Sequence, residues 1–149
     1  MLRTYTELLQ HHTFEDRFHY LKLGGSVGRS TFGFDRYLNQ HFYRSAEWRH
    51  VRHEVIARDL GRDLGVQGYE IWDRIYIHHM NPMTVEDIGH GNADILDPDF
   101  LISASLMTHN AIHYGDAKLL RQPLVERKPG DQILWRSNEH PHHVGRHQQ

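Results

Sequence analysis

Apolar and polar residues repeat with a helical period in the first quarter of the chain. Within residues 4–23, apolar side chains recur at near-helical spacing at Leu8, Leu9, Phe14, Phe18 and Leu21. Thr13, with Asp16 three residues later, is typical of a helix start. The segment is therefore expected to be helical, and a second start at Thr13 would divide it into two short helices.

A clearer helix is predicted from Ser45 onward. Ser45 is a suitable N-cap and Gly61 a suitable stop signal. One apolar face lies between them, formed by Trp48, Val51, Val55 and Ile56. Three arginines lie mostly on the other faces, at Arg49, Arg52 and Arg58. They are either the solvated side of an ordinary amphipathic helix or a face that contacts phosphates.

The pattern changes to strand composition at residues 69–79, which are rich in isoleucine and tyrosine. Residues 80–98 contain two prolines and two glycines and are predicted to form a loop. Residues 100–106 are predicted to form a second strand, and residues 107–120 a helix with Thr108 near its start. The predicted order is strand, loop, strand and helix.

Two regions flank this unit. Residues 23–34 contain four glycines and two serines but no lysine, so a phosphate-binding P-loop is excluded. A flexible connector is the favoured interpretation, with a loop that contacts nucleic acid as the alternative. We divide the chain into an N-terminal helical and glycine-rich extension (1–44), a core (45–122) and a C-terminal extension with a disordered histidine-rich tail (123–149).

Composition narrows the possible functions. The chain of 149 residues fits one domain, and its mean hydropathy of −0.69 is that of a polar, soluble protein for which the cytoplasm is the expected compartment. It contains no cysteine, so disulfides, thiol nucleophiles and cysteine-based zinc sites are excluded. No apolar run approaches the roughly 20 residues that span a bilayer. A net charge of −2 argues against an indiscriminate nucleic-acid coating protein, although a local basic surface stays possible.

Histidine is abundant, with 15 residues, so any histidine pair needs support from its surroundings. Three adjacent pairs occur, at 11–12, 78–79 and 142–143, where about one or two are expected by chance. His109 and His113 are four residues apart, so on a helix both imidazoles face the same side. The tail repeats that spacing at 143 and 147, which shows that the spacing alone is weak evidence.

The combination of these features is more specific. The pair His78-His79 ends a predicted strand, is followed by Asn81-Pro82, and precedes by about thirty residues a helix that carries "THNAIH". This order resembles the HNH nucleases, and in particular the small HNH proteins of tailed bacteriophages. The resemblance covers about residues 14–135. It implies an α+β fold with a ββα-metal (HNH) core, flanking N-terminal helices and a short C-terminal extension.

The resemblance also implies roles for four histidines. His78 takes the place of the first metal ligand and His79 that of the general base. His109 takes the place of the helix ligand, and His113 is a further ligand or a contact to the scissile phosphate. One divalent ion is expected, and Mg²⁺, Mn²⁺, Ni²⁺ and Zn²⁺ all stay open as its identity.

One position departs from the family pattern. Many HNH nucleases carry an asparagine just before the leucine of the second strand, where it holds the hairpin in place. Here that position is Phe100, so the hydrogen bond would have to come from elsewhere, with Asn81, Asn92 and Asn110 as the candidates.

The expected function is a metal-dependent endonuclease that nicks or cuts double-stranded DNA and leaves a 5′-phosphate and a 3′-hydroxyl. The resemblance further implies a phage terminase as a partner during DNA packaging, and the host cytoplasm as the location. Five side chains are candidate phosphate contacts, namely Arg49, Arg52, Arg58, Lys118 and Arg121. Two alternatives stay open: a DNA-binding module that keeps the metal but does not cut, and a histidine-rich domain whose metal binding is incidental.

Overall fold

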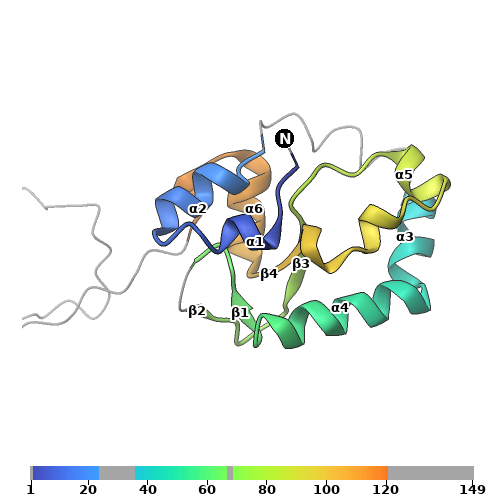
Figure 1. The fold of residues 1–149 in the computed structure, drawn as a ribbon, viewed down its shortest axis with the longest axis horizontal. Coiled ribbons are helices and arrows are strands. Elements are labelled where there is room, and N and C mark those ends of the chain that lie inside the picture. The colour runs from blue at the N-terminus through green and yellow to red at the C-terminus, as the bar shows by residue number, and fades with distance from the viewer. Residues whose placement is uncertain (1, 24–35, 67–68, 121–149) are drawn as a thin grey trace, which may run out of the picture.

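The computed structural model describes residues 2–23, 36–66 and 69–120 (Figure 1). Its helices are α1 (Tyr5–Leu8), α2 (Phe14–Leu21), α3 (Arg36–Arg44), α4 (Ala46–Arg58), α5 (Val85–Gly89) and α6 (Leu106–Tyr114). Its strands are β1 (Arg62–Asp63), β2 (Tyr69–Glu70), β3 (Tyr76–His79) and β4 (Leu101–Ala104). Three short 3-10 turns are η1 (Ala93–Leu96), η2 (Pro98–Phe100) and η3 (Ala117–Leu119). Helices with two small sheets make an α+β fold, as the sequence predicted.

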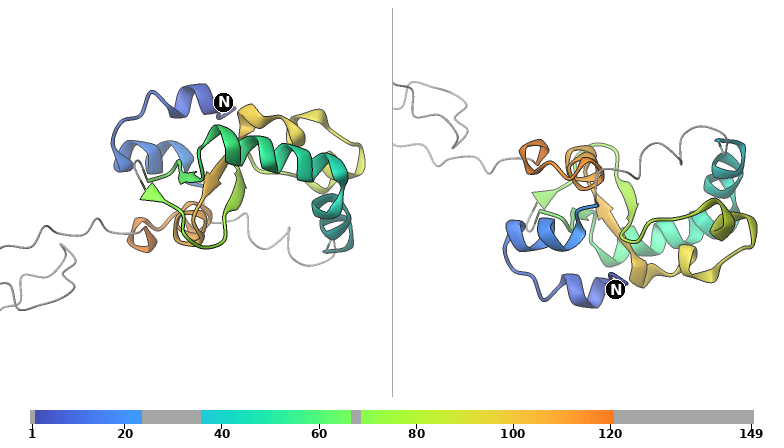
Figure 2. Two further views of the ribbon diagram at one scale, coloured as in Figure 1. Left: turned by 90° about the horizontal axis from the view of Figure 1, so that it is seen from below. Right: turned by 90° about the horizontal axis from the view of Figure 1, so that it is seen from above.

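The antiparallel pair β3–β4 lies at the centre of the described chain. Its register places His78 opposite Ile102 and His79 opposite Leu101. Successive side chains of a strand point to opposite faces, so His78 and His79 face opposite sides of the pair. Helix α6 covers one side and α4 the other, an arrangement on which the views of Figures 1 and 2 agree.

A separate hydrophobic core lies on each side of this pair. Ile102 belongs to a core on the α6 side, together with Leu8, Leu21, Leu23, Leu64, Met80 and Ile112. Leu101 belongs to a core on the α4 side, together with Phe42, Trp48, Val51, Val55 and Ile95. Segments from both sides of the predicted boundary at residue 44 therefore share these cores.

The N-terminal predictions are confirmed where the structure describes them. Thr13 caps α2 by accepting a hydrogen bond from the Asp16 backbone N–H, so the first helical segment is divided into α1 and α2. Ser45 caps α4 in the same way through the Trp48 N–H. The helix ends at Arg58, and the chain turns through left-handed conformations at Leu60 and Gly61.

Two predictions between residues 69 and 98 were wrong in part. Residues 69–79 are not one strand, because the chain bends near residue 73 and divides the segment into β2, which pairs with β1, and β3, which pairs with β4. The predicted loop at 80–98 contains α5 and η1. A capping box between Thr84 and Asp87 starts α5, and this local signal outweighs the nearby proline and glycines.

The last helix also differs in its boundaries. Ser105 is the N-cap of α6, and its hydroxyl accepts a hydrogen bond from the N–H of Thr108, which lies in the first turn, near the helix start as predicted. The helix ends at Tyr114 because Gly115 adopts the left-handed conformation, with φ of 65°, that commonly stops a helix. Residues 117–119 form the separate turn η3.

The buried Asp63 fixes the start of α6. Its Oδ1 accepts hydrogen bonds from the backbone N–H groups of Gly65 and Val66, at 2.9 and 3.3 Å. Its Oδ2 accepts from the Ser105 backbone N–H at 3.0 Å and from the Thr108 hydroxyl at 2.7 Å. One carboxylate therefore connects β1 to the first turn of the helix that carries His109 and His113.

We expect Asp63→Asn to lower the free energy of unfolding by about 2–4 kcal/mol, because in either orientation the new amide N–H₂ would face a backbone N–H, that of Ser105 or that of Gly65. Urea denaturation monitored by circular dichroism measures this loss. The matched control is Asp73→Asn, which changes an exposed carboxyl and should stay within about 0.5 kcal/mol of the wild type. Equal stability of the two variants would contradict the anchoring role of Asp63.

Candidate metal centre

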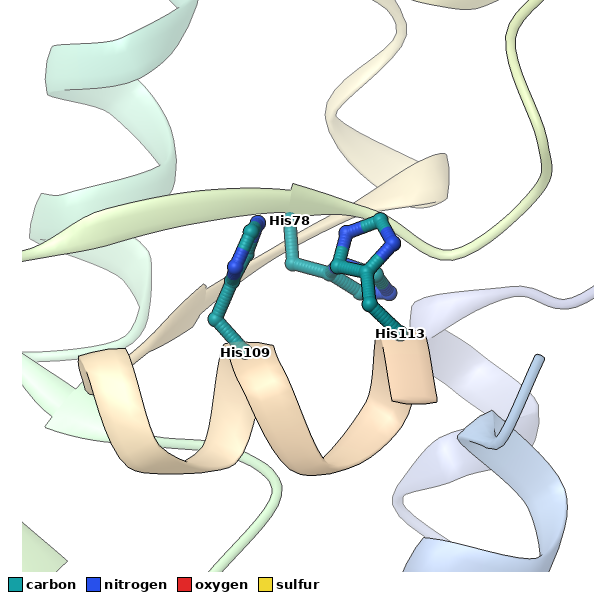
Figure 3. A group of neighbouring side chains, drawn as sticks. All are labelled: His78, His109 and His113. Carbon is teal, nitrogen blue, oxygen red and sulfur yellow. The ribbon is translucent and has the colours of Figure 1, made fainter. Parts of the chain in front are cut away.

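Three histidines from β3 and α6 gather on one side of the strand pair (Figure 3). His109 and His113 lie one turn apart on α6 and point toward β3, from which His78 faces them. Each residue offers one ligand atom, and these atoms all lie within 4.8 Å of one another. The structure thus brings together all three of the metal ligands expected from the sequence, close enough to hold an ion.

Among the described residues, some buried nitrogens of this cluster have no hydrogen-bond partner. Both ring nitrogens of His78 and the Nδ1 of His109 are buried in this way. His78 is only 1% exposed, so water does not replace the missing partners. Leaving a buried polar atom unpaired costs about 1–3 kcal/mol, so three such atoms together need an explanation. A metal ion takes one lone pair from each neutral imidazole, so it would satisfy one of the two His78 nitrogens together with the His109 nitrogen.

Burial also keeps these imidazoles neutral. It lowers the pKa of His78 well below its ordinary value, and the neighbouring His113 and His109 lower it further because like charges repel. Burial lowers the pKa of His109 to about 4, with repulsion from His113 as a second cause. The pKa of His113 is lowered by burial as well. At neutral pH the rings therefore carry free lone pairs, and protons do not compete with a metal.

The donor set limits the choice of metal. Two imidazole nitrogens on one tetrahedral Zn²⁺ lie about 3.4 Å apart, since each bond is about 2.0–2.1 Å. Small side-chain shifts therefore suffice to close the cluster, whose ligand atoms lie within 4.8 Å of one another. Three imidazoles without a carboxylate suit Zn²⁺ or Ni²⁺ better than Mg²⁺, which prefers oxygen. Three protein ligands also leave coordination positions open for water or a substrate oxygen.

His79 lies on the other side of β3, in contact with the α4 core. Its Nε2 is 3.0 Å from the backbone carbonyl of Ile95. Its ring stacks on the indole of Trp48, with centroids 5.4 Å apart and planes 15° from parallel. A carbonyl can only accept, so Nε2 carries the proton and Nδ1 keeps the lone pair. Burial lowers the pKa of His79 to about 4, which keeps this ring neutral at pH 7.

The asparagines considered as substitutes at the Phe100 position have other partners. The Asn81 side chain exchanges two hydrogen bonds with the backbone of Arg3, at 2.8 and 2.9 Å. The Asn92 side chain accepts from the Asp94 N–H and donates to Asp87. Asn110 follows His109 on α6, where burial lowers the pKa of that imidazole and the Asn110 side chain raises it in part, so Asn110 acts on the cluster rather than on His79. The His79 ring is hydrogen-bonded instead to the backbone carbonyl of Ile95.

The five predicted phosphate contacts are placed differently from one another. Arg49 and Lys118 are exposed and available to a ligand. Arg52 is half-buried and donates to the Ile75 carbonyl at 3.2 Å. Arg121 lies outside the described residues.

Arg58 is engaged within the fold. Its guanidinium donates to the carbonyls of Pro98 and Leu101, each at 2.7 Å, and pairs with Asp59 at 2.7 Å. It also lies 3.7 Å from the centre of the Tyr5 ring. These contacts tie the end of α4 to β4, so Arg58 is a structural residue in this arrangement.

Sequence reasoning missed two residues beside the cluster. The Tyr76 ring lies 5.5 Å from that of His109, and the exposed Arg74 has its guanidinium 5.3 Å from the Tyr76 ring centre. The alternation Arg74, Tyr76, His78 could have indicated a common face, because strand residues two apart point the same way. Arg74 is thus an additional candidate for a phosphate contact.

Comparisons with protein-family models, curated proteins and solved structures found no match. Among the described residues, no helix has both the length and the apolar character that crossing a membrane requires.

We expect His109→Ala to weaken Zn²⁺ or Ni²⁺ binding by at least about 10²-fold, because removing even an outer-shell partner of a ligand costs about 10–100-fold. Isothermal titration calorimetry on the full chain measures the effect. His143→Ala removes one member of the tail pair and serves as the control, with an expected change of less than about threefold at the tight site. If His143→Ala lost metal affinity and His109→Ala did not, the tail would be shown to bind the metal.

Proposed function

We propose that the protein is a metal-dependent endonuclease of the HNH type that hydrolyses phosphodiester bonds in double-stranded DNA, by nicking or by cutting. The observation that carries this proposal is the pairing of two sites at one strand. Three imidazoles gather on one side of β3, two of them (His78 and His109) with unpartnered buried nitrogens. His79, the residue after His78, offers a neutral imidazole on the other side. In this proposal β3, β4 and α6 are the ββα-metal core.

The three-histidine cluster supplies the electrophilic half of the chemistry. His78, His109 and His113 would hold the cation, and their neutral state at pH 7 favours coordination. A divalent ion bound there would polarise the phosphoryl oxygen and stabilise the leaving 3′-oxygen.

His79 supplies the general base. With Nε2 donating to the Ile95 carbonyl, Nδ1 is the atom that takes a proton from the attacking water. In the free protein burial disfavours the protonated ring, so the pKa lies near 4. An anionic phosphate beside the ring would raise that pKa again, because an opposite charge favours the imidazolium. Base strength would therefore increase when DNA binds.

The two halves have to meet at the end of β3. The strand ends at His79, and the His113 imidazole is close enough to affect the pKa of His79 through its charge. A phosphate bound beyond this end of the strand would contact the cation on one side and the activated water on the other. The expected products are a 5′-phosphate and a 3′-hydroxyl.

DNA recognition would depend mainly on phosphate contacts. Arg49, Arg74 and Lys118 are the exposed cations that support this role. Binding through phosphates is sensitive to salt and weakly selective for sequence. A role in phage DNA packaging with terminase, in the host cytoplasm, extends the proposal and derives from the resemblance alone.

A second candidate function is a DNA-binding module that keeps the metal without cutting. Phe100 in the place of the family's asparagine favours it, and so does a base whose pKa is low in the free protein. This module would use the same histidine cluster to stabilise its fold.

Plasmid nicking by the full chain tests the proposal, with Mg²⁺, Mn²⁺, Ni²⁺ or Zn²⁺ added in turn. We expect His79→Ala to convert supercoiled DNA at least about 10²-fold more slowly than wild type, since a positioned base contributes roughly 10²–10⁴-fold. His50→Ala, at an exposed position of α4, is the matched control and should cut at the wild-type rate.

Two results would contradict the proposal. Cutting by His79→Ala at the wild-type rate would remove His79 from the mechanism. Binding of metal and DNA by both proteins, with no cutting by either under any of the four metals, would favour the non-cutting module.

A further inference from the structure

The Nδ1 of His79 can act as a base only if the imidazole ring is held in one orientation. Within the part of the chain that the structure describes, the Ile95 carbonyl is the hydrogen-bond partner of this ring, through Nε2. One such bond fixes the ring plane only weakly, because Nε2 lies close to the Cβ–Cγ axis about which the imidazole rotates. A second contact that fixes the ring plane is needed before Nδ1 points in one direction.

Trp48 provides that plane. Its indole is 5% exposed and lies nearly parallel to the imidazole, with centroids 5.4 Å apart and planes at 15°. The Phe42 ring approaches the same imidazole at 6.3 Å with a tilt of 48°. A flat surface parallel to the ring opposes rotation about the Cβ–Cγ bond, so the stack and the hydrogen bond together determine where Nδ1 points.

The residues that make the two contacts to the His79 ring, Ile95 and Trp48, belong to the same hydrophobic core. Ile95, Trp48 and Phe42 are all buried members of the core on the α4 side. Phe42 also contacts Trp48 directly, with ring centroids 5.2 Å apart. Ser45 caps the first turn of α4 through the backbone N–H of Trp48 itself, which fixes the position of that residue on the helix. The indole is thus held from several directions.

We propose that Trp48 is a positioning residue for His79, acting with the Ile95 carbonyl to hold the imidazole in one tautomer and one orientation. The inference about ring position rests on geometry alone, while its consequence for catalysis rests on the proposed nuclease function. In this proposal α4 orients the general base through Trp48, a role separate from contacting DNA. This role also explains how His79 is oriented although Asn81 and Asn92 are engaged with other partners.

Nuclear magnetic resonance of the full chain, labelled with ¹⁵N-histidine and held at one pH, tests the positioning directly. The ¹⁵N shifts of the two ring nitrogens report the tautomer, and side-chain couplings report the rotamer. In wild type we expect one tautomer with the proton on Nε2, and one rotamer. In Trp48→Leu, which keeps apolar bulk without a flat surface, we expect averaged ring-nitrogen shifts and averaged couplings.

Two further variants separate positioning from general loosening of the core. Trp48→Phe restores an aromatic plane and should recover the single tautomer and rotamer. Val55→Ala alters the same buried cluster on the same helix, about 10 Å further along, and should leave the His79 ring unchanged. The proposal would be overturned if the His79 shifts and couplings were averaged as strongly in Val55→Ala as in Trp48→Leu. It would also be overturned if Trp48→Leu kept the single tautomer and rotamer of the wild type.

Kinetics add a readout that depends on cutting. Because a displacement of about 1 Å can cost about 10²-fold in rate, we expect kcat for Trp48→Leu to fall by about 10–100-fold, with KM and Zn²⁺ affinity unchanged. Trp48→Phe should stay within about threefold of wild type. A parallel loss of Zn²⁺ affinity would overturn the assignment, because it would show damage to the whole fold. If the wild type does not cut, the proposed function fails, and the resonance measurements still decide the role of Trp48.

Discussion

The arrangement depends on one constraint, the alternation of side chains along the four residues of β3 in a fixed register with β4. His78 pairs with Ile102 and His79 with Leu101, so adjacent histidines face opposite sides of the pair. A slip of one residue would exchange the two faces and place His79 toward α6. The two hydrophobic cores keep this register, because Ile102 is buried in one and Leu101 in the other.

Two buried carboxylates fasten the helices to this pair. Asp59, at the end of α4, accepts a hydrogen bond from the Ser103 backbone N–H at 2.7 Å. Asp63, four residues later, accepts from the Ser105 N–H at 3.0 Å, just after the same strand. These two hydrogen bonds hold both helices in fixed positions relative to β4: α4, which carries Trp48, and α6, which carries His109. The chemistry proposed for the two sides needs this common reference, since the groups have to act on one phosphate.

Signals that reside in local sequence predicted much of this structure. Caps such as Thr13 and Ser45, the apolar face of α4, and the spacing of His109 and His113 all depend on neighbours within one helix. The gathering of His78 with the other two was expected only through a resemblance, since β3 and α6 are about thirty residues apart in the sequence. The contacts that orient His79 could not be predicted from the sequence. Every residue has a backbone carbonyl, so nothing in the sequence distinguishes that of Ile95. A tryptophan on the apolar face of a helix, such as Trp48, usually only packs in the hydrophobic core.

A crystal structure of the full chain with Zn²⁺ and a short DNA duplex would test the central claim most directly, namely that the two faces of β3 act on one phosphate. We expect the ion on His78, His109 and His113, a phosphate oxygen in its open position, and a water between the phosphorus and the Nδ1 of His79. An ion on these three histidines with the DNA phosphates far from His79 would contradict the account. The histidine cluster would then be a structural metal site.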